Sequence, residues 1–145
     1  MLIDAFAATL HGSAIRTGDA DITPASDRDN HRLAAALRDL DARIRTDAVP
    51  EGLPFNPGGE GLARGQIWNL QTQYGDLDRA FQPSGTEGYD DLAANAVTYE
   101  VGGVQAQVAS LLDVIRSKEA AGRPKDHAML PTLRKLLDRI TREPK

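Results

Sequence analysis

The chain has 145 residues, of which 41% are hydrophobic and 26% charged, as in an ordinary globular protein with one core. Its formal net charge of −4 argues against a large nonspecific nucleic-acid surface, and the lack of cysteine excludes disulfides and thiolate metal sites. The sequence has neither the start of a signal peptide nor the roughly 18 consecutive apolar residues of a membrane-spanning helix. We therefore expect a single cytoplasmic domain over residues 1–145 that makes no membrane contact.

The first residues predict a strand, a helix and a second strand in close succession. Residues 1–3 form an apolar strand stub, and residues 5–10 have helix-forming composition. Gly12-Ser13 should end this helix, because glycine is a common C-terminal stop. In residues 19–22 acidic and apolar residues alternate, which predicts a short strand with both acids on one face.

The acids of this strand, Asp19 and Asp21, are the most informative feature of the sequence. Carboxylates about 7 Å apart on one strand face repel each other, which costs stability unless a cation lies between them. Hard oxygen ligands suit Mg²⁺, which proteins usually hold by one or two carboxylates together with substrate phosphates. An isolated Asp-x-Asp tripeptide also fits a polar edge strand with two solvated acids. The neighbouring sequence is therefore needed to choose between a metal site and such a strand.

The middle of the chain predicts a helix, two strands and a long loop. The core-facing residues of the helix should be Leu33, Ala36, Leu37 and Leu40. Residues 42–45 predict a short strand, and the alternating residues 66–72 predict a half-buried one. Residues 47–61 are rich in proline and glycine, which predicts a long loop that is either a simple insertion or a substrate-facing lid.

The last part of the chain predicts a strand at 76–81, a short helix at 89–95 and a hairpin that turns at Gly102-Gly103. A capping pattern at Ser110 opens a helix that ends near residue 121. In the final helix Pro131 should lie in or near the first turn. The apolar face of that helix should consist of Leu130, Leu133, Leu137 and Ile140. Strands interspersed with helices predict an α+β or α/β domain with a mixed sheet.

The segment 10–22, Leu-His-Gly-Ser-Ala-Ile-Arg-Thr-Gly-Asp-Ala-Asp-Ile, resembles the nucleotidyltransferase (polymerase β-like) superfamily. It is most similar to the branch of AbiEii-type and MenT-type bacterial toxins, in which a glycine-rich turn precedes a D-x-D strand. Residues 75–78 resemble the later G-x-L-D strand of that branch, and residues 118–126 resemble its distal K…R-x-K-D segment. The resemblance extends over residues 3–137 and implies an N-terminally shortened nucleotidyltransferase fold with C-terminal helices.

The resemblance also implies a set of site residues. Those expected to be catalytic are Asp19, Asp21, Asp78, Lys118 and Asp126, and those expected to bind the nucleotide are Ser13, Arg16, Arg123 and Lys125. Asp19, Asp21 and Asp78 would hold one or two Mg²⁺ ions against the phosphates of an NTP, and the third acid would also serve as general base. Asp76 shares a strand face with Asp78 and is the alternative third ligand, unless both acids only flank a turn. Lys118 would contact phosphate, although the helix dipole alone also favours a lysine at that helix end.

The sequence departs from the family pattern at Asp4-Ala5, which stands where the family has Gly-Gly. Those glycines let backbone N–H groups approach a phosphate closely, whereas a carboxylate there would repel a triphosphate. The helix that usually precedes the first strand is also missing. Either the start codon lies further upstream, or the nucleotide cradle is degraded.

The leading hypothesis is an Mg²⁺-dependent enzyme that transfers a nucleoside monophosphate from an NTP to a hydroxyl group and releases pyrophosphate. By resemblance, the acceptor would be a tRNA or a protein, and the enzyme would be the toxin of a toxin–antitoxin pair with a cognate antitoxin. The alternative is a nucleotidyltransferase-fold protein that has lost catalysis and acts as a binding or regulatory partner. Asp4-Ala5 favours the alternative, whereas Asp19, Asp21, Lys118 and Asp126 favour the enzyme.

Overall fold

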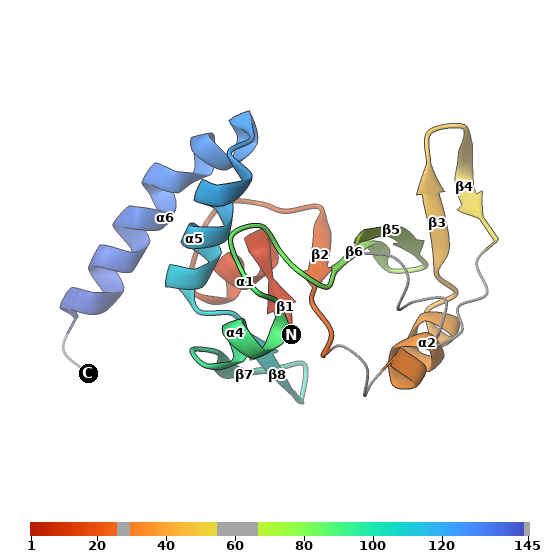
Figure 1. Ribbon diagram of the computed structural model, residues 1–145, viewed down its shortest axis with the longest axis horizontal. Helices are drawn as coiled ribbons and strands as arrows, with labels where there is room; N and C mark the ends of the chain where they lie inside the picture. Colours follow the sequence, from red (N-terminus) through yellow and green to blue (C-terminus); the bar gives the residue numbers. More distant parts are fainter. Residues whose placement is uncertain (26–29, 55–66, 144–145) are drawn as a thin grey trace.

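The computed structural model describes residues 1–25, 30–54 and 67–143, which form a mixed sheet with helices at both ends (Figure 1). The strands are β1 (Leu2–Ile3), β2 (Asp19–Ile22), β3 (Arg43–Thr46), β4 (Val49–Leu53), β5 (Ile67–Thr72), β6 (Gly75–Ala80), β7 (Val97–Val101) and β8 (Val104–Val108). The helices are α1 (Asp4–Leu10), α2 (Asn30–Asp39), α4 (Tyr89–Ala93), α5 (Leu111–Ala121) and α6 (Pro124–Arg142). The strand order is β4-β3-β5-β6-β2-β1-β8-β7, which confirms the α+β fold class with a mixed sheet. No helix of the described ranges is long and apolar enough to cross a bilayer.

The centre of the sheet brings the two acidic segments side by side. β2 and β6 pair in parallel, with Asp19 opposite Asp76 and Asp21 opposite Asp78. Because side chains alternate along a strand, this register places all four acids on one face of the sheet. Both acidic segments are therefore strands, and the interpretation of residues 76 and 78 as flanking a turn is wrong.

Two apolar clusters hold the helices against the sheet. The first joins β1 and β8 to α1, α4, α5 and α6, and its buried residues are Ile3, Ala7, Ala8, Leu92, Val108, Ala109, Leu111, Val114, Ile115, Leu130, Leu133 and Leu136. The second packs α2 on β5, and its buried residues are Ala34, Leu37, Ala42 and Leu70. Because the first cluster fixes α5 against α1, it also fixes the relative positions of Lys118 on α5 and Asp4 on α1.

Several local predictions are confirmed. Ser110 is the N-cap of α5, because its Oγ accepts a hydrogen bond from the backbone N–H of Asp113 at 3.1 Å. α5 ends at Gly122, which adopts the left-handed conformation with φ +64° that glycine tolerates best. The hairpin of β7 and β8 turns at Gly102 and Gly103, whose φ values of +58° and +82° fit a turn with two positive φ angles.

The last helix begins earlier than the sequence predicts. α6 starts at Pro124, since proline at the first helical position needs no hydrogen-bond donor, and Pro131 lies inside the helix. The carboxylate of Asp126 accepts a hydrogen bond from the Arg123 backbone N–H at 3.2 Å, which caps this earlier start. The buried residues on the apolar face are Leu130, Leu133 and Leu136. Ile140, expected on that face, is instead 43% exposed.

The predicted loop over residues 47–61 contains a strand. Residues 49–53 form β4, which pairs with β3 as an edge strand and therefore tolerates Pro50. Gly52 adopts φ +81°, and a Cβ there would lie 2.8 Å from the Cβ of Arg43, so the hairpin requires glycine. Residues 55–61 lie outside the described residues. Their interpretation as a simple insertion or a substrate-facing lid therefore stays a prediction.

The buried side of α2 also differs by one position from the prediction. Ala34 is buried and Ala36 is exposed, whereas Leu37 is buried and Leu33 partly buried as expected. Both sets fit helical spacing, and the contact with Leu70 of β5 decides which side faces the sheet.

Candidate functional site

Three carboxylates converge where β2 and β6 lie side by side. Asp19, Asp21 and Asp78 each offer one oxygen, and these oxygens lie within 4.8 Å of one another. We call these three residues the acidic cluster. Asp76 is not part of it: its side chain is 43% exposed and pairs with Arg45. The geometry therefore favours Asp78 over Asp76 as the third acid, the assignment preferred from the family pattern.

The electrostatics of the acidic cluster suit a cation. Burial is the largest cause that raises the pKa of Asp21 to about 7. The carboxylates of Asp4 and of the other two cluster residues add to this rise, and Lys118 opposes it. The pKa of Asp78 is also raised, first by burial and then by contact with Asp19. An all-oxygen donor set of mutually repelling carboxylates fits a hard divalent cation such as Mg²⁺.

Two residues that sequence reasoning did not single out hold the cluster in place. Thr17 donates a hydrogen bond from its hydroxyl to Oδ1 of Asp19 at 3.0 Å. Arg45 of β3 donates to Oδ1 of Asp78 at 2.7 Å and pairs with Oδ2 of Asp76 at 3.1 Å. Thr17 could have been found from its place two residues before the acidic strand. Arg45 could not, because only the strand order brings β3 near β6.

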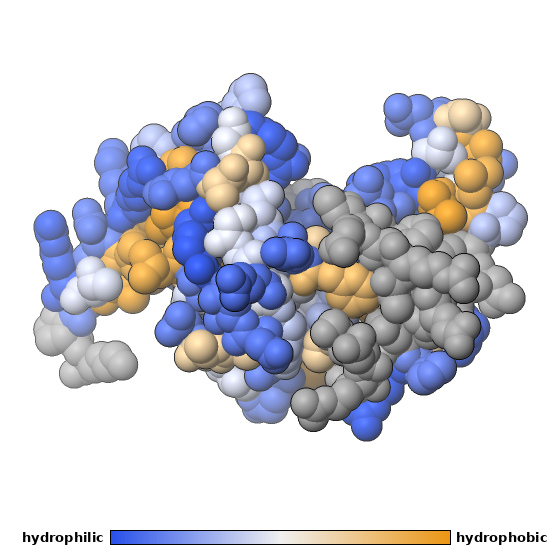
Figure 2. Space-filling view, in the orientation of Figure 1, coloured by the Kyte–Doolittle hydropathy of each residue, from blue (hydrophilic) through white to orange (hydrophobic). Residues whose placement is uncertain are grey.

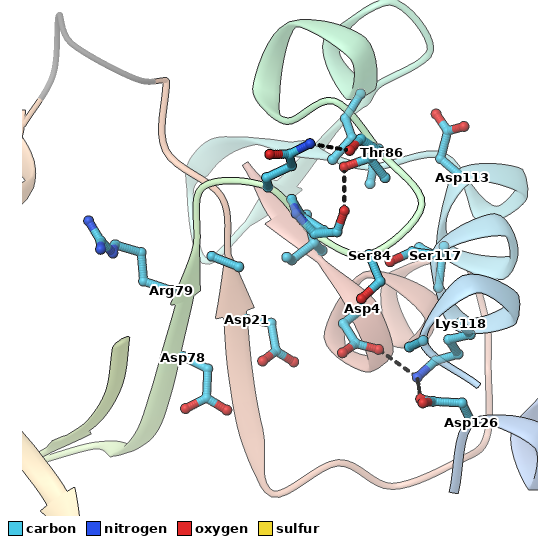
Figure 3. Close-up of a pocket in the computed structure, with 18 of the residues that line it drawn as sticks. Asp4, Asp21, Asp78, Arg79, Ser84, Thr86, Asp113, Ser117, Lys118 and Asp126 are labelled. Carbon is cyan, nitrogen blue, oxygen red and sulfur yellow. Dashed lines mark hydrogen bonds and ion pairs between the residues drawn. The ribbon is translucent and has the colours of Figure 1, made fainter. Parts of the chain in front are cut away.

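A pocket of about 310 Å³ opens beside the acidic cluster, and Asp21 and Asp78 line one side of it (Figure 3). Lys118 and Ser117 of α5 line the opposite side. In the space-filling view the surface dips between α5 and the β3–β4 hairpin, and the hairpin side of this dip shows both hydrophilic and hydrophobic residues (Figure 2). A pocket that combines a cluster of carboxylates with a lysine suits a ligand that carries anionic groups and can bind a metal ion.

The loop between β6 and α4 forms a rigid wall of this pocket. The Thr86 hydroxyl donates to the carbonyl of Pro83 at 2.8 Å and accepts from the Gly88 N–H at 3.2 Å. Gly85 has φ +71°, and a Cβ there would lie 2.6 Å from the Cβ of Ala120 on α5. The loop therefore packs directly on α5 and is held by hydrogen bonds within itself.

Lys118 lies at the inner side of the pocket between two carboxylates (Figure 3). Its side chain is buried, and its Nζ lies 2.5 Å from Oδ1 of Asp4 and 3.4 Å from Oδ1 of Asp126. Asp4 is the first residue of α1 and has φ +57°, a left-handed conformation that favours glycine. The residue that the resemblance aligns with a glycine thus has a glycine-like backbone conformation, and its carboxylate pairs with Lys118.

Asp126 anchors both cations at this side of the pocket. It is fully buried and accepts hydrogen bonds from Nε and Nη2 of Arg123 at 2.7 and 3.2 Å. Burial acts to raise the pKa of Asp126, but the hydrogen bonds and charge of Arg123, together with Lys118, hold that pKa below its usual value. An ionised carboxylate with both oxygens engaged orients Lys118 and Arg123 toward the pocket.

The other predicted nucleotide-binding residues lie apart from this pocket. Ser13 accepts a hydrogen bond on its Oγ from the backbone N–H of Ile15 at 3.2 Å. Arg16 and Lys125 are exposed. Ser13, Arg16 and Lys125 do not line the pocket, whereas Arg123 does. Nucleotide contacts from the first three stay predictions.

Comparison with known proteins supports the fold. No protein-family model and no curated protein matches this sequence. The crystal structure of the lincosamide antibiotic adenylyltransferase LnuA with lincomycin bound is similar, with a TM-score of 0.58 and 14% sequence identity. The similarity covers 93% of this chain and 85% of that chain. It shows that this chain has a nucleotidyltransferase fold, and the resemblance to the AbiEii and MenT-type toxins stays a prediction.

Proposed function

We propose that this protein is a metal-dependent nucleotidyltransferase that moves a nucleoside monophosphate from an NTP to a hydroxyl group. The observation that carries the proposal is the convergence of Asp19, Asp21 and Asp78 beside a pocket that Asp21 and Asp78 line together with Lys118 and Arg123. Carboxylates from two paired strands suit metal ions, and the cations on α5 and at the start of α6 suit phosphate oxygens. The nucleotidyltransferase fold shared with LnuA supports this arrangement.

Each side chain has a part in the proposed reaction. Asp19, Asp21 and Asp78 would hold one or two Mg²⁺ ions, which neutralise charge on the phosphates and polarise the phosphoryl group. The acceptor oxygen forms a bond to the α-phosphorus, the bond to the β-phosphate oxygen breaks, and pyrophosphate leaves. The acceptor hydroxyl would give its proton to Asp78. Lys118 and Arg123 bind the phosphates, and Asp126 positions both cations.

For the acceptor we propose a hydroxyl on a tRNA or a protein, in line with the toxin resemblance, and a cognate antitoxin as partner. LnuA, the structurally similar protein, is an adenylyltransferase for lincosamide antibiotics, which are small molecules. The same assay should therefore include small hydroxylated compounds as acceptors. The three acceptor classes are distinguished by where label from an α-labelled NTP is found after separation.

A second candidate function is a transferase-fold protein with impaired catalysis. The ion pair of Lys118 with Asp4 favours it, because Asp4 competes with a phosphate for the same ammonium group. In that case the pocket would bind a ligand without turning it over.

The test is a transfer assay with each of four α-labelled NTPs and Mg²⁺. The acceptors are total tRNA, cell-extract protein and a panel of hydroxylated small molecules. We expect label transfer from at least one NTP, its loss in EDTA, and its loss in Asp21→Asn. Binding of an NTP without transfer to any acceptor would favour the impaired protein. If no NTP binds with Mg²⁺ present, both candidate functions are wrong.

A further inference from the structure

Arg45 contacts the acidic cluster from the side opposite Lys118. β3 is separated from β6 by β5 in the sheet, so the Arg45 side chain reaches across one strand to meet Asp78. On the way, its Nη1 donates to the carbonyl of Leu70 on β5 at 3.4 Å. The guanidinium thus bridges two carboxylates of β6, Asp76 and Asp78, while its position is fixed from the strand between.

We propose that Arg45 is the internal counter-ion of the acidic cluster and weakens the binding of a divalent cation before the nucleotide binds. This inference rests on the proposed function, because it assigns a role relative to the metal ions that the cluster would hold. The guanidinium lies 2.7 Å from one oxygen of Asp78, so a metal ion on the same carboxylate would be only a few Å away. A single and a double positive charge at that distance repel each other, which weakens metal binding to the nucleotide-free protein.

A nucleotide changes this balance. Its triphosphate brings several negative charges to the same place, which offset the repulsion between Arg45 and the metal ion. Metal and nucleotide then bind with positive coupling, and by linkage each strengthens the other by the same factor. Lys118 differs from Arg45 because the two carboxylates that it pairs with, Asp4 and Asp126, do not belong to the acidic cluster.

A purely structural role for Arg45 gives a different expectation. If the guanidinium only ties β3 to β6, its removal would lower stability without strengthening metal binding. The two roles therefore differ in how the removal of Arg45 changes one measurable quantity, the affinity of the nucleotide-free protein for a divalent cation. A counter-ion role predicts a higher affinity, and a purely structural role does not.

The chain offers a matched control for this measurement. Arg43 lies two residues earlier on the same strand, and its Nε donates to the backbone carbonyls of Glu51 and Gly52 at 2.9 and 3.1 Å. Arg43→Met removes the same charge from β3 without removing a partner of the cluster. Arg45→Lys keeps the charge near Asp78 and gives up the two-pronged geometry.

The experiment is a titration with Mn²⁺, followed by electron paramagnetic resonance of the free ion, with and without a non-hydrolysable NTP analogue. Without nucleotide, Arg45→Met should bind Mn²⁺ about tenfold more tightly than the parent. This is the factor given by Coulomb's law for a single and a double charge roughly 6 Å apart in a medium close to water. Arg43→Met and Arg45→Lys should stay within about twofold of the parent, and the analogue should strengthen Mn²⁺ binding less in Arg45→Met than in the parent.

Equal or weaker Mn²⁺ binding by nucleotide-free Arg45→Met would overturn the inference, provided that the variant is folded by circular dichroism. If it does not fold, Arg45→Gln keeps a hydrogen-bonding side chain without the charge and is judged by the same criterion. Failure of the proposed function has a separate signature, in which the parent binds no Mn²⁺ even with the NTP analogue.

Discussion

Replacing Asp21 with asparagine should make the metal-free protein more stable at neutral pH. Burial and three neighbouring carboxylates raise the pKa of Asp21 from 3.8 to about 7, so ionising it in the folded state costs free energy. A rise of that size corresponds to roughly 4 kcal/mol at full ionisation. The side chain is only partly buried, and solvent screening reduces the expected gain to roughly 1–2 kcal/mol. Asparagine has nearly the same shape and carries no charge.

The sign of the pH dependence follows from linkage. Because the pKa of Asp21 is higher in the folded than in the unfolded protein, the folded state binds more protons between these two pKa values. The stability linked to this proton is complete below about pH 4 and is lost as the pH rises through about 7. The advantage of Asp21→Asn should therefore be largest near pH 8 and clearly smaller near pH 5.

Urea unfolding in EDTA at pH 5 and pH 8 measures this directly. The control is Asp138→Asn, which removes one carboxylate from the exposed side of α6 and should change stability by less than about 0.5 kcal/mol at either pH. The reasoning is refuted if Asp21→Asn is no more stable than the parent at pH 8, or if its gain does not depend on pH.

Three further variants test other parts of the site. Asp4→Gly removes a non-glycine residue from a left-handed φ and releases Lys118 from its ion pair with Asp4, so the NTP affinity measured by calorimetry should rise about tenfold. An unchanged affinity would mean that Asp4 does not face the phosphates. Lys118→Met leaves Asp4 without its ion-pair partner and leaves Asp126 paired with Arg123 alone, so thermal unfolding should show a loss of about 3 kcal/mol together with loss of NTP binding. Retained binding would exclude the lysine from the phosphate site. Gly85→Ala places a Cβ against Ala120 of α5 and should lower the free energy of unfolding by at least about 2 kcal/mol. Gly102→Ala has a similar positive φ but open space around it, so its loss of stability should be smaller. Equal losses would contradict close packing of the pocket wall on α5.

The parts of the site that could be predicted from the sequence are those set by local periodicity. Alternation in residues 19–22 predicts two acids on one strand face, and the capping signal at Ser110 fixes where α5 begins. The glycine pair at 102–103 likewise predicts its hairpin turn. Each of these signals depends on residues within one turn or strand, so no knowledge of the tertiary structure is needed.

The parts that could not be predicted depend on contacts between distant segments. Arg45 can contact Asp78 because the strand order places only β5 between β3 and β6. Nothing near Arg45 in the sequence indicates this order. Pro50 argues against a strand, yet β4 tolerates it at the sheet edge. Either Pro124 or Pro131 could begin α6 on sequence grounds. The helix begins at Pro124, where the Asp126 carboxylate accepts a hydrogen bond from the Arg123 backbone N–H.

The measurement that tests the central claim most directly is calorimetry of NTP binding in Mg²⁺ and in EDTA, with each of the four NTPs. If Asp19, Asp21 and Asp78 hold metal ions against the phosphates, at least one NTP should bind ten times or more tightly in Mg²⁺ than in EDTA. Asp78→Asn should remove most of that difference. Equal affinities in Mg²⁺ and in EDTA, or an Mg²⁺ effect that survives in Asp78→Asn, would contradict a metal-bridged nucleotide site at the acidic cluster.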